Sequence, residues 1–117
     1  MLKEINKKLL ERFKKNPERW IKQAIGYDIT GKPVTFGSQR LWCGCLINHT
    51  INVCNEIKNN FPQSTLQLAG CYVIALSFLK NVDELADWND GLTTTVHDII
   101  KLLEDFDKSS YTQQYSI

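Results

Sequence analysis

Cys45 and His49 are the two side chains of this sequence best placed for catalytic chemistry. They are four residues apart, so on a helix they would lie one turn apart on the same face. A thiolate beside an imidazole is the activated form of a cysteine nucleophile, and such a pair could also contribute to a metal site. No further metal ligand follows at a matching spacing. The favoured interpretation is that Cys45 and His49 are two surface residues that happen to lie one turn apart. They are kept as catalytic candidates only. Neither a metal nor a cofactor is predicted.

The other cysteines fit a buried structural role better than a chemical one. Cys43, Cys54 and Cys71 stand among apolar residues, where an unpaired cysteine behaves as a small hydrophobic side chain. A single residue separates Cys43 from Cys45, which is not the C-x-x-C spacing of zinc sites and thiol redox centres. The sequence also lacks a glycine-rich phosphate loop, an H-E-x-x-H motif and a G-x-S-x-G motif. Common enzyme classes with local signatures are therefore not indicated.

A second group of candidates combines tryptophans with short polar side chains. Trp42, Trp88, Asn89 and Asp90 could line a small-molecule pocket, since such pockets pair an apolar surface with a few fixed polar groups. In the structural alternative, Trp88 anchors a turn in the core while Asn89 and Asp90 bond to neighbouring backbone. We favour the structural alternative and keep the four residues as binding candidates.

The formal net charge of +1 conceals an uneven distribution of charge. Residues 1–22 hold eight Lys or Arg and three Glu, whereas residues 83–107 hold eight Asp or Glu and one Lys. The basic segment could contact nucleic acid. However, each of its Glu residues lies four positions before a Lys residue, which is typical of a solvated helix. No nucleic-acid recognition motif accompanies the basic residues. A protein partner is preferred, because segregated charge can steer association. The candidate binding residues of the acidic segment are Asp83, Glu84, Asp87 and Asp90.

Helices must position most of these residues. Apolar residues recur at helical spacing along much of the chain, and residues 66–79 are apolar nearly all round, which predicts a central buried helix. The pattern predicts helices over residues 2–15, 17–25, 39–59, 66–79 and 96–107, with one or two further turns over residues 83–88. The predicted fold class is mainly α, a compact single domain of five to six helices with a short β-hairpin or ordered loop near residues 27–36.

Two local patterns refine this scheme. At 100° per residue, the helix over residues 39–59 has one apolar face, and the opposite side holds Cys45, Asn48, His49, Asn52 and Asn55. These side chains are therefore expected to point to solvent. Thr95 lies three residues before Asp98, a capping-box variant that predicts the start of the last helix.

The ends of the chain differ in character. Residues 1–107 are predicted to form one helical domain, whereas residues 108–117 carry no helical pattern and are predicted to be a flexible C-terminal tail. No apolar stretch reaches the roughly 18 residues of a membrane span, and the Lys-rich start lacks the apolar core of a signal peptide. The expectation is a cytoplasmic protein without membrane association.

Four short segments carry a resemblance. They are Asp28 with Gly31-Lys32-Pro33-Val34, Trp42-Cys43, Trp88-Asn89-Asp90, and Thr95 with Asp98-Ile99. In this order they resemble a family of short bacterial and phage proteins known only as a domain of unknown function, whose signature has Gly-x-Pro-Val, Trp-Cys-x-x-Gly-Ala-Leu, Trp-Asn-Asp and Thr-x-x-Glu-Val. The chain departs from it at residues 44–47 and at Asp98, so Cys45 is not implied as a family site. The resemblance implies a compact helical fold and an association with phage or mobile-element genes, and it implies no reaction.

The missing enzyme signatures, the small size and the segregated charge together predict a small cytosolic helical interaction protein that binds a macromolecule. With the resemblance, a phage or mobile-element accessory, inhibitor or immunity-type factor is the expected role. The alternative is an enzyme or a small-molecule or metal-binding protein centred on Cys45 and His49, or on the group Trp42, Trp88, Asn89 and Asp90. The sequence specifies no oligomeric state.

Overall fold

A computed structural model describes residues 2–61 and 63–109. Within them, five α-helices account for most of the structure, and β1 and β2 form one small antiparallel sheet. This confirms the predicted mainly α fold with a short β element. In chain order the elements are α1 (Leu2–Lys15), η1 (Pro17–Arg19), β1 (Gly26–Tyr27), β2 (Cys43–Gly44), α2 (Leu46–Ile57), η2 (Lys58–Asn60), α3 (Thr65–Lys80), α4 (Leu85–Asn89) and α5 (Val96–Lys108).

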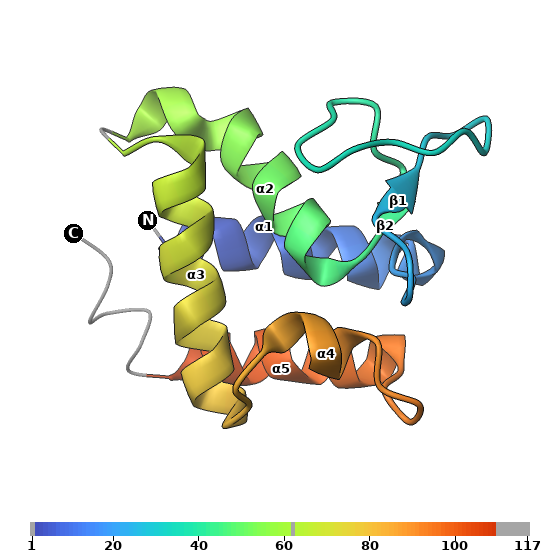
Figure 1. The fold of residues 1–117 in the computed structure, drawn as a ribbon. Helices are drawn as coiled ribbons and strands as arrows, with labels where there is room; N and C mark the ends of the chain where they lie inside the picture. The colour runs from blue at the N-terminus through green and yellow to red at the C-terminus, as the bar shows by residue number, and fades with distance from the viewer. Residues whose placement is uncertain (1, 62, 110–117) are drawn as a thin grey trace.

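The hydrophobic core lies where α1, α2, α3 and α5 meet. Leu2, Ile5, Leu9 and Phe13 recur every three or four residues along α1, and all four are fully buried. α1 packs against α2 and α5, and α2 packs against α3. Figure 1 shows α1 and α5 running side by side, with α3 crossing both. The amphipathic pattern of α1 therefore places this helix at the centre of the domain.

A buried polar link joins three of these helices. The Asn6 side chain of α1 donates from Nδ2 to the Leu103 carbonyl of α5 at 2.8 Å. Its Oδ1 atom accepts a hydrogen bond from the Tyr72 hydroxyl of α3 at 2.5 Å. Each polar atom of the Asn6 amide and the Tyr72 hydroxyl takes part in a hydrogen bond. Burying these two side chains therefore leaves no donor or acceptor group without a partner.

Side-chain caps fix where α3 and α5 begin. Asp98 donates its backbone amide to Thr95 Oγ1, and the Thr95 amide donates to Asp98 Oδ2 at 2.8 Å, which confirms the predicted capping box. Ser64 and Gln67 form the equivalent pair at the start of α3. These local devices depend only on residues close in sequence, which is why the sequence locates the start of α5 and places that of α3 within one residue.

The predicted helix over residues 17–25 is wrong beyond Arg19. Only η1 is helical, and the backbone at Trp20 is already extended. The Ile21 amide donates to the Gly44 carbonyl at 3.0 Å, and Gln23 adopts a left-handed conformation with φ +63°. Hydrogen bonds to a distant segment thus satisfy the backbone groups that a helix would have paired locally.

The predicted helix over residues 39–59 begins later than expected, at Leu46. Within the predicted range, Cys43 and Gly44 instead form β2, which pairs with β1. The two strands approach so closely at Gly44 that an added Cβ atom would lie 2.6 Å from the Ile25 carbonyl oxygen. A residue without a Cβ atom is therefore needed at this crossing.

The region near residues 27–36 is an ordered loop, one of the two predicted forms. Tyr27 makes an isolated antiparallel bridge with Pro33. Asp28 Oδ1 accepts hydrogen bonds from the backbone amides of Thr30 at 2.9 Å and Lys32 at 3.0 Å. The Asp side chain thus organises the turn in the manner typical of Asx turns.

The prediction that α3 is buried all round is wrong. Its inner side, which includes Tyr72, is buried, but Ile74 and Phe78 are 56% and 65% exposed. Cys71, expected in the core, is exposed as well, whereas Cys54 is buried as predicted. The neighbouring helices cover only the inner side of α3, so an apolar outer side is left facing solvent.

α5 extends through Lys108, which was predicted to be the first residue of the C-terminal tail. Residues 110–117 of that predicted tail lie outside the described residues. In the described part of the chain, no helix has the length and apolar character needed to cross a bilayer.

Candidate functional site

His49 is fully buried, which corrects the expectation that it faces solvent. Its Nδ1 atom lies 3.0 Å from Nη1 of Arg12, and its Nε2 atom lies 2.7 Å from the Arg19 carbonyl oxygen. A guanidinium only donates, so Nδ1 accepts and Nε2 carries the proton that is donated to the carbonyl. Both ring nitrogens are therefore committed to the fold.

Burial lowers the pKa of His49 to about 3, and the positive charges of Arg12 and Arg19 act in the same direction. Arg12 is held in place by Glu56, whose Oε1 atom accepts from Nη2 at 3.1 Å. The imidazole is therefore neutral near pH 7 and links α1, η1 and α2. This arrangement explains the position of His49 without a catalytic role.

Cys45 is the N-cap residue of α2 and does not pair with His49 through its side chain. Its Sγ atom accepts a hydrogen bond from the Asn48 amide at 3.4 Å. Burial raises the pKa of the Cys45 thiol, so the reactive thiolate is less abundant than for an ordinary cysteine. The proposed nucleophile and base are thus not assembled. Within the described residues, no group of three or more His, Cys, Asp or Glu is arranged to hold a metal ion.

Asn89 has a structural role, but three of its four partners are distant in sequence, and the fourth is the Asp90 side chain rather than neighbouring backbone. Its Oδ1 atom accepts from Trp20 Nε1 at 2.6 Å and from the Leu46 amide at 3.0 Å. Its Nδ2 atom donates to the Ile21 carbonyl and to Asp90 Oδ1. One buried amide therefore fixes α4 against the start of α2 and the segment after η1.

Each of the two candidate tryptophans contacts a cation of the same chain through its ring. The Arg19 guanidinium carbon is 4.4 Å from the centre of the Trp42 ring, and Lys80 Nζ is 4.9 Å from that of Trp88. Such contacts stabilise a ring at an exposed site by about 0.5–1 kcal/mol. Neither ring lines the clefts described next, so the predicted four-residue pocket is only half assembled, by Asn89 and Asp90.

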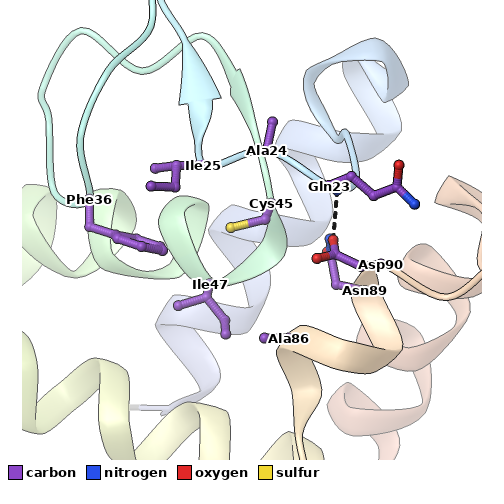
Figure 2. Close-up of a pocket in the computed structure, with 9 residues that line it drawn as sticks. All are labelled: Gln23, Ala24, Ile25, Phe36, Cys45, Ile47, Ala86, Asn89 and Asp90. Atoms are coloured by element: carbon purple, nitrogen blue, oxygen red, sulfur yellow. Dashed lines mark hydrogen bonds between the residues drawn. The ribbon is translucent and has the colours of Figure 1, made fainter.

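Two apolar clefts meet at Ile47 and Ala86. The first has a volume of about 450 Å³, and the second about 470 Å³. Ile25 and Phe36 flank the first cleft, and Figure 2 shows both side chains beside Cys45. Val73, Ile74 and Phe78 of α3 line the second. We call the two clefts together the binding groove.

Large apolar side chains on the walls of the binding groove remain accessible to solvent. Ile25 is 43% and Phe36 is 52% exposed, and Ile74 and Phe78 on α3 are exposed to a similar extent. They come from three segments far apart in sequence, which is why sequence reasoning missed them. The one available signal was the excess of apolar residues in α3 over what a single inner face requires.

Three asparagines of α2 form hydrogen bonds to the loop that carries Phe36 and so hold this residue over the groove. Asn48 Oδ1 accepts from the Gly37 amide at 3.0 Å, and Asn48 Nδ2 donates to the Thr35 carbonyl. Asn52 and Asn55 donate to carbonyls of the same loop. Asn48 and Asn52 are therefore buried, contrary to the prediction that this side of α2 faces solvent.

Three of the four acidic candidates line the binding groove. Asp83 and Glu84 line the second cleft, Asp90 lines the first, and Asp87 is exposed on α4. We call Asp83, Glu84 and Asp90 the acidic rim. In the part of the chain that the structure describes, none of them takes part in an ion pair. Asp90 Oδ1 does accept from the Gln23 amide at 2.7 Å, as drawn in Figure 2.

Comparison with known proteins supplies no relative for this arrangement. No family model matches the chain, and no curated protein and no solved structure is significantly similar to it. The function has to be inferred from the geometry of the chain itself.

Proposed function

We propose that this chain is a protein-interaction module whose binding groove takes a partner segment with apolar and basic side chains. A single observation carries the proposal: exposed apolar walls occur along the same groove as carboxylates that form no ion pair in the described part of the chain. An accessory, inhibitory or immunity-type role in the cytoplasm, as expected from the sequence and its resemblance, would be carried out by such binding.

The apolar walls would supply most of the affinity. Burial of apolar surface contributes about 25 cal/mol per Å², and aromatic side chains at the centre of an interface contribute most per residue. Phe36 and Phe78 are the aromatic residues exposed on the two clefts. Loss of either ring should therefore weaken binding strongly.

The acidic rim would supply orientation and speed of association. Carboxylates that form no ion pair among the described residues attract a basic partner over about one Debye length, roughly 8–10 Å at ordinary salt. The basic surface of α1 lacks exposed large apolar residues that could fill the clefts. A different protein is therefore a better occupant than this region of a second copy.

The alternative of a small-molecule site is less well supported by the polar groups of the groove. Asn89 uses its whole amide within the chain, and Asp90 already accepts from Gln23 and Asn89. Small-molecule pockets usually offer a few free polar groups that fix the ligand. The first cleft offers mainly apolar surface.

The test uses a fluorescent amphipathic peptide of about 18 residues made of Leu and Lys, with a Leu and Glu peptide of the same pattern as its charge control. Fluorescence anisotropy should show binding of the Lys peptide that weakens with salt, and binding of the Glu peptide at least about tenfold weaker. Phe78→Ser should weaken the binding of the Lys peptide about tenfold or more.

Ile29→Ser is the matched control, because Ile29 is 76% exposed but does not line the groove. It should leave binding unchanged. Replacing two rim carboxylates, Asp83→Asn with Glu84→Gln, should reduce both affinity and salt dependence. Equal loss from Phe78→Ser and Ile29→Ser, or equal binding of the two peptides, would refute the proposed function.

A further inference from the structure

We infer that the partner segment binds as an α-helix, with one large apolar side chain in each cleft and basic residues toward the acidic rim. This inference rests on the proposed function and specifies the form of its partner. It follows from three features of the groove: its backbone hydrogen bonding, its polar side chains and its division into two clefts.

The described strands offer no edge on which an extended peptide could add a strand. β1 and β2 contain two residues each, and they pair with one another. The Gly26 carbonyl also accepts from Val34, and the Tyr27 carbonyl accepts from Trp42. Strand addition needs a row of free main-chain groups, so this recognition mode is not available here.

Apart from the rim carboxylates and the Gln23 side chain, the polar side chains that line the groove are engaged within the chain. Ser77 Oγ donates to the Val73 carbonyl at 2.8 Å, and the Gln23 amide donates to Asp90. Asn89 is committed to the fold, as described above. An extended peptide would therefore bury main-chain groups without partners, whereas a helix satisfies most of its own.

The division of the groove sets the spacing of the anchors. Ile47 and Ala86 belong to both clefts, so they form the boundary that an occupant must cross. Two large side chains on one helix face, one or two turns apart, can lie on either side of such a boundary. Ala86 is small and exposed, so a helix backbone can approach closely between its anchors.

Charge complementarity identifies the partner as a basic helix. Asp83 and Glu84 lie beside the second cleft and Asp90 beside the first, so negative charge extends along both clefts. Lys or Arg residues that flank the apolar face of a helix would lie near these carboxylates. Recognition would then follow the helix-in-groove mode, with anchors spaced at helical intervals.

The experiment compares the Leu and Lys peptide with a version that has the same sequence but contains two central D-Lys residues, which disrupt a right-handed helix. Composition and charge are identical. The all-L peptide should bind at least about tenfold tighter than the D-Lys peptide, because only it presents both anchors on one face. Phe36→Ser and Phe78→Ser should each weaken it, while Ile29→Ser should not.

The outcomes separate the two proposals. Equal affinity of the all-L and D-Lys peptides, with both still sensitive to Phe78→Ser, would refute the helical form and leave the groove as the docking site. Insensitivity of both peptides to Phe36→Ser and Phe78→Ser would refute the groove itself. A concentration-dependent doubling of mass that Phe78→Ser abolishes would show that a second copy fills the groove. Circular dichroism of each variant checks that it is folded.

Discussion

Acidification should destabilise the folded protein through His49. The ring is fully buried, and burial lowers its folded pKa to about 3 from an ordinary value of 6.5. Below pH 6.5 the unfolded chain binds a proton at His49 and the folded chain does not. Proton binding therefore favours unfolding, and the stabilisation by the neutral ring is lost progressively as the pH falls from about 6.5 toward 3.

The magnitude follows from the size of this gap. Each pH unit below 6.5 costs about 1.4 kcal/mol of unfolding free energy until the folded pKa is reached. Between about pH 7.5 and about pH 5, the contribution of His49 should therefore be about 2 kcal/mol. Carboxylates with lowered pKa values, such as Asp28 and Asp98, act mainly below this window.

The assay is urea unfolding, followed by far-ultraviolet circular dichroism at both pH values. His49→Gln retains an oxygen that can accept from Arg12 and an amide that can donate to the Arg19 carbonyl, but its side chain cannot titrate. Over the same pH window, the free energy of unfolding of this variant should therefore fall by about 2 kcal/mol less than that of the natural chain. His97→Gln is the control, because His97 is exposed. An undiminished pH dependence in His49→Gln would refute this account of the buried imidazole.

Three further predictions concern stability and thiol reactivity. Asn89→Ala should lower the free energy of unfolding by about 2–4 kcal/mol in urea titrations, because it leaves a buried indole N–H and a backbone amide without their acceptor; a loss below about 0.5 kcal/mol would contradict this. Tyr72→Phe should cost about 1–3 kcal/mol by the same measurement, since it removes the hydroxyl that donates to Asn6, and a neutral effect would show that water replaces it. Cys71 should alkylate faster than Cys45 at neutral pH, because Cys71 is exposed while burial raises the pKa of the Cys45 thiol; mass spectrometry after brief iodoacetamide treatment would reveal the reverse order if Cys45 were activated.

Features that depend on nearby residues could be predicted from the sequence. The apolar stripe of α1 and the capping box formed by Thr95 and Asp98 are both present as expected. Each involves residues within a few positions of one another, where helical geometry fixes which side chains meet. The start of α2 was misplaced because residues 43–44 pair with residues 26–27. That pairing overrides a helical pattern that looked continuous.

Burial of the polar side of α2 was the clearest failure of local reasoning. Angular position correctly put Asn48, His49 and Asn52 opposite the apolar face, but the expected exposure was wrong. The loop over residues 35–38 covers the asparagines, and Arg12 and the Arg19 carbonyl bond to His49. Angular position gives the face of a helix, whereas exposure depends on what packs against that face.

The sequence alone determined the helical class of this protein, the start of α5, that of α3 to within one residue, and the segregation of its charge. These follow from local periodicity, capping chemistry and composition. Only the tertiary structure decided that His49 and Asn89 are structural and that the exposed walls at Phe36 and Phe78 share a groove with the acidic rim. The physical reason is that a groove and a buried hydrogen-bond network are made by side chains distant in sequence, which meet only after the helices have packed.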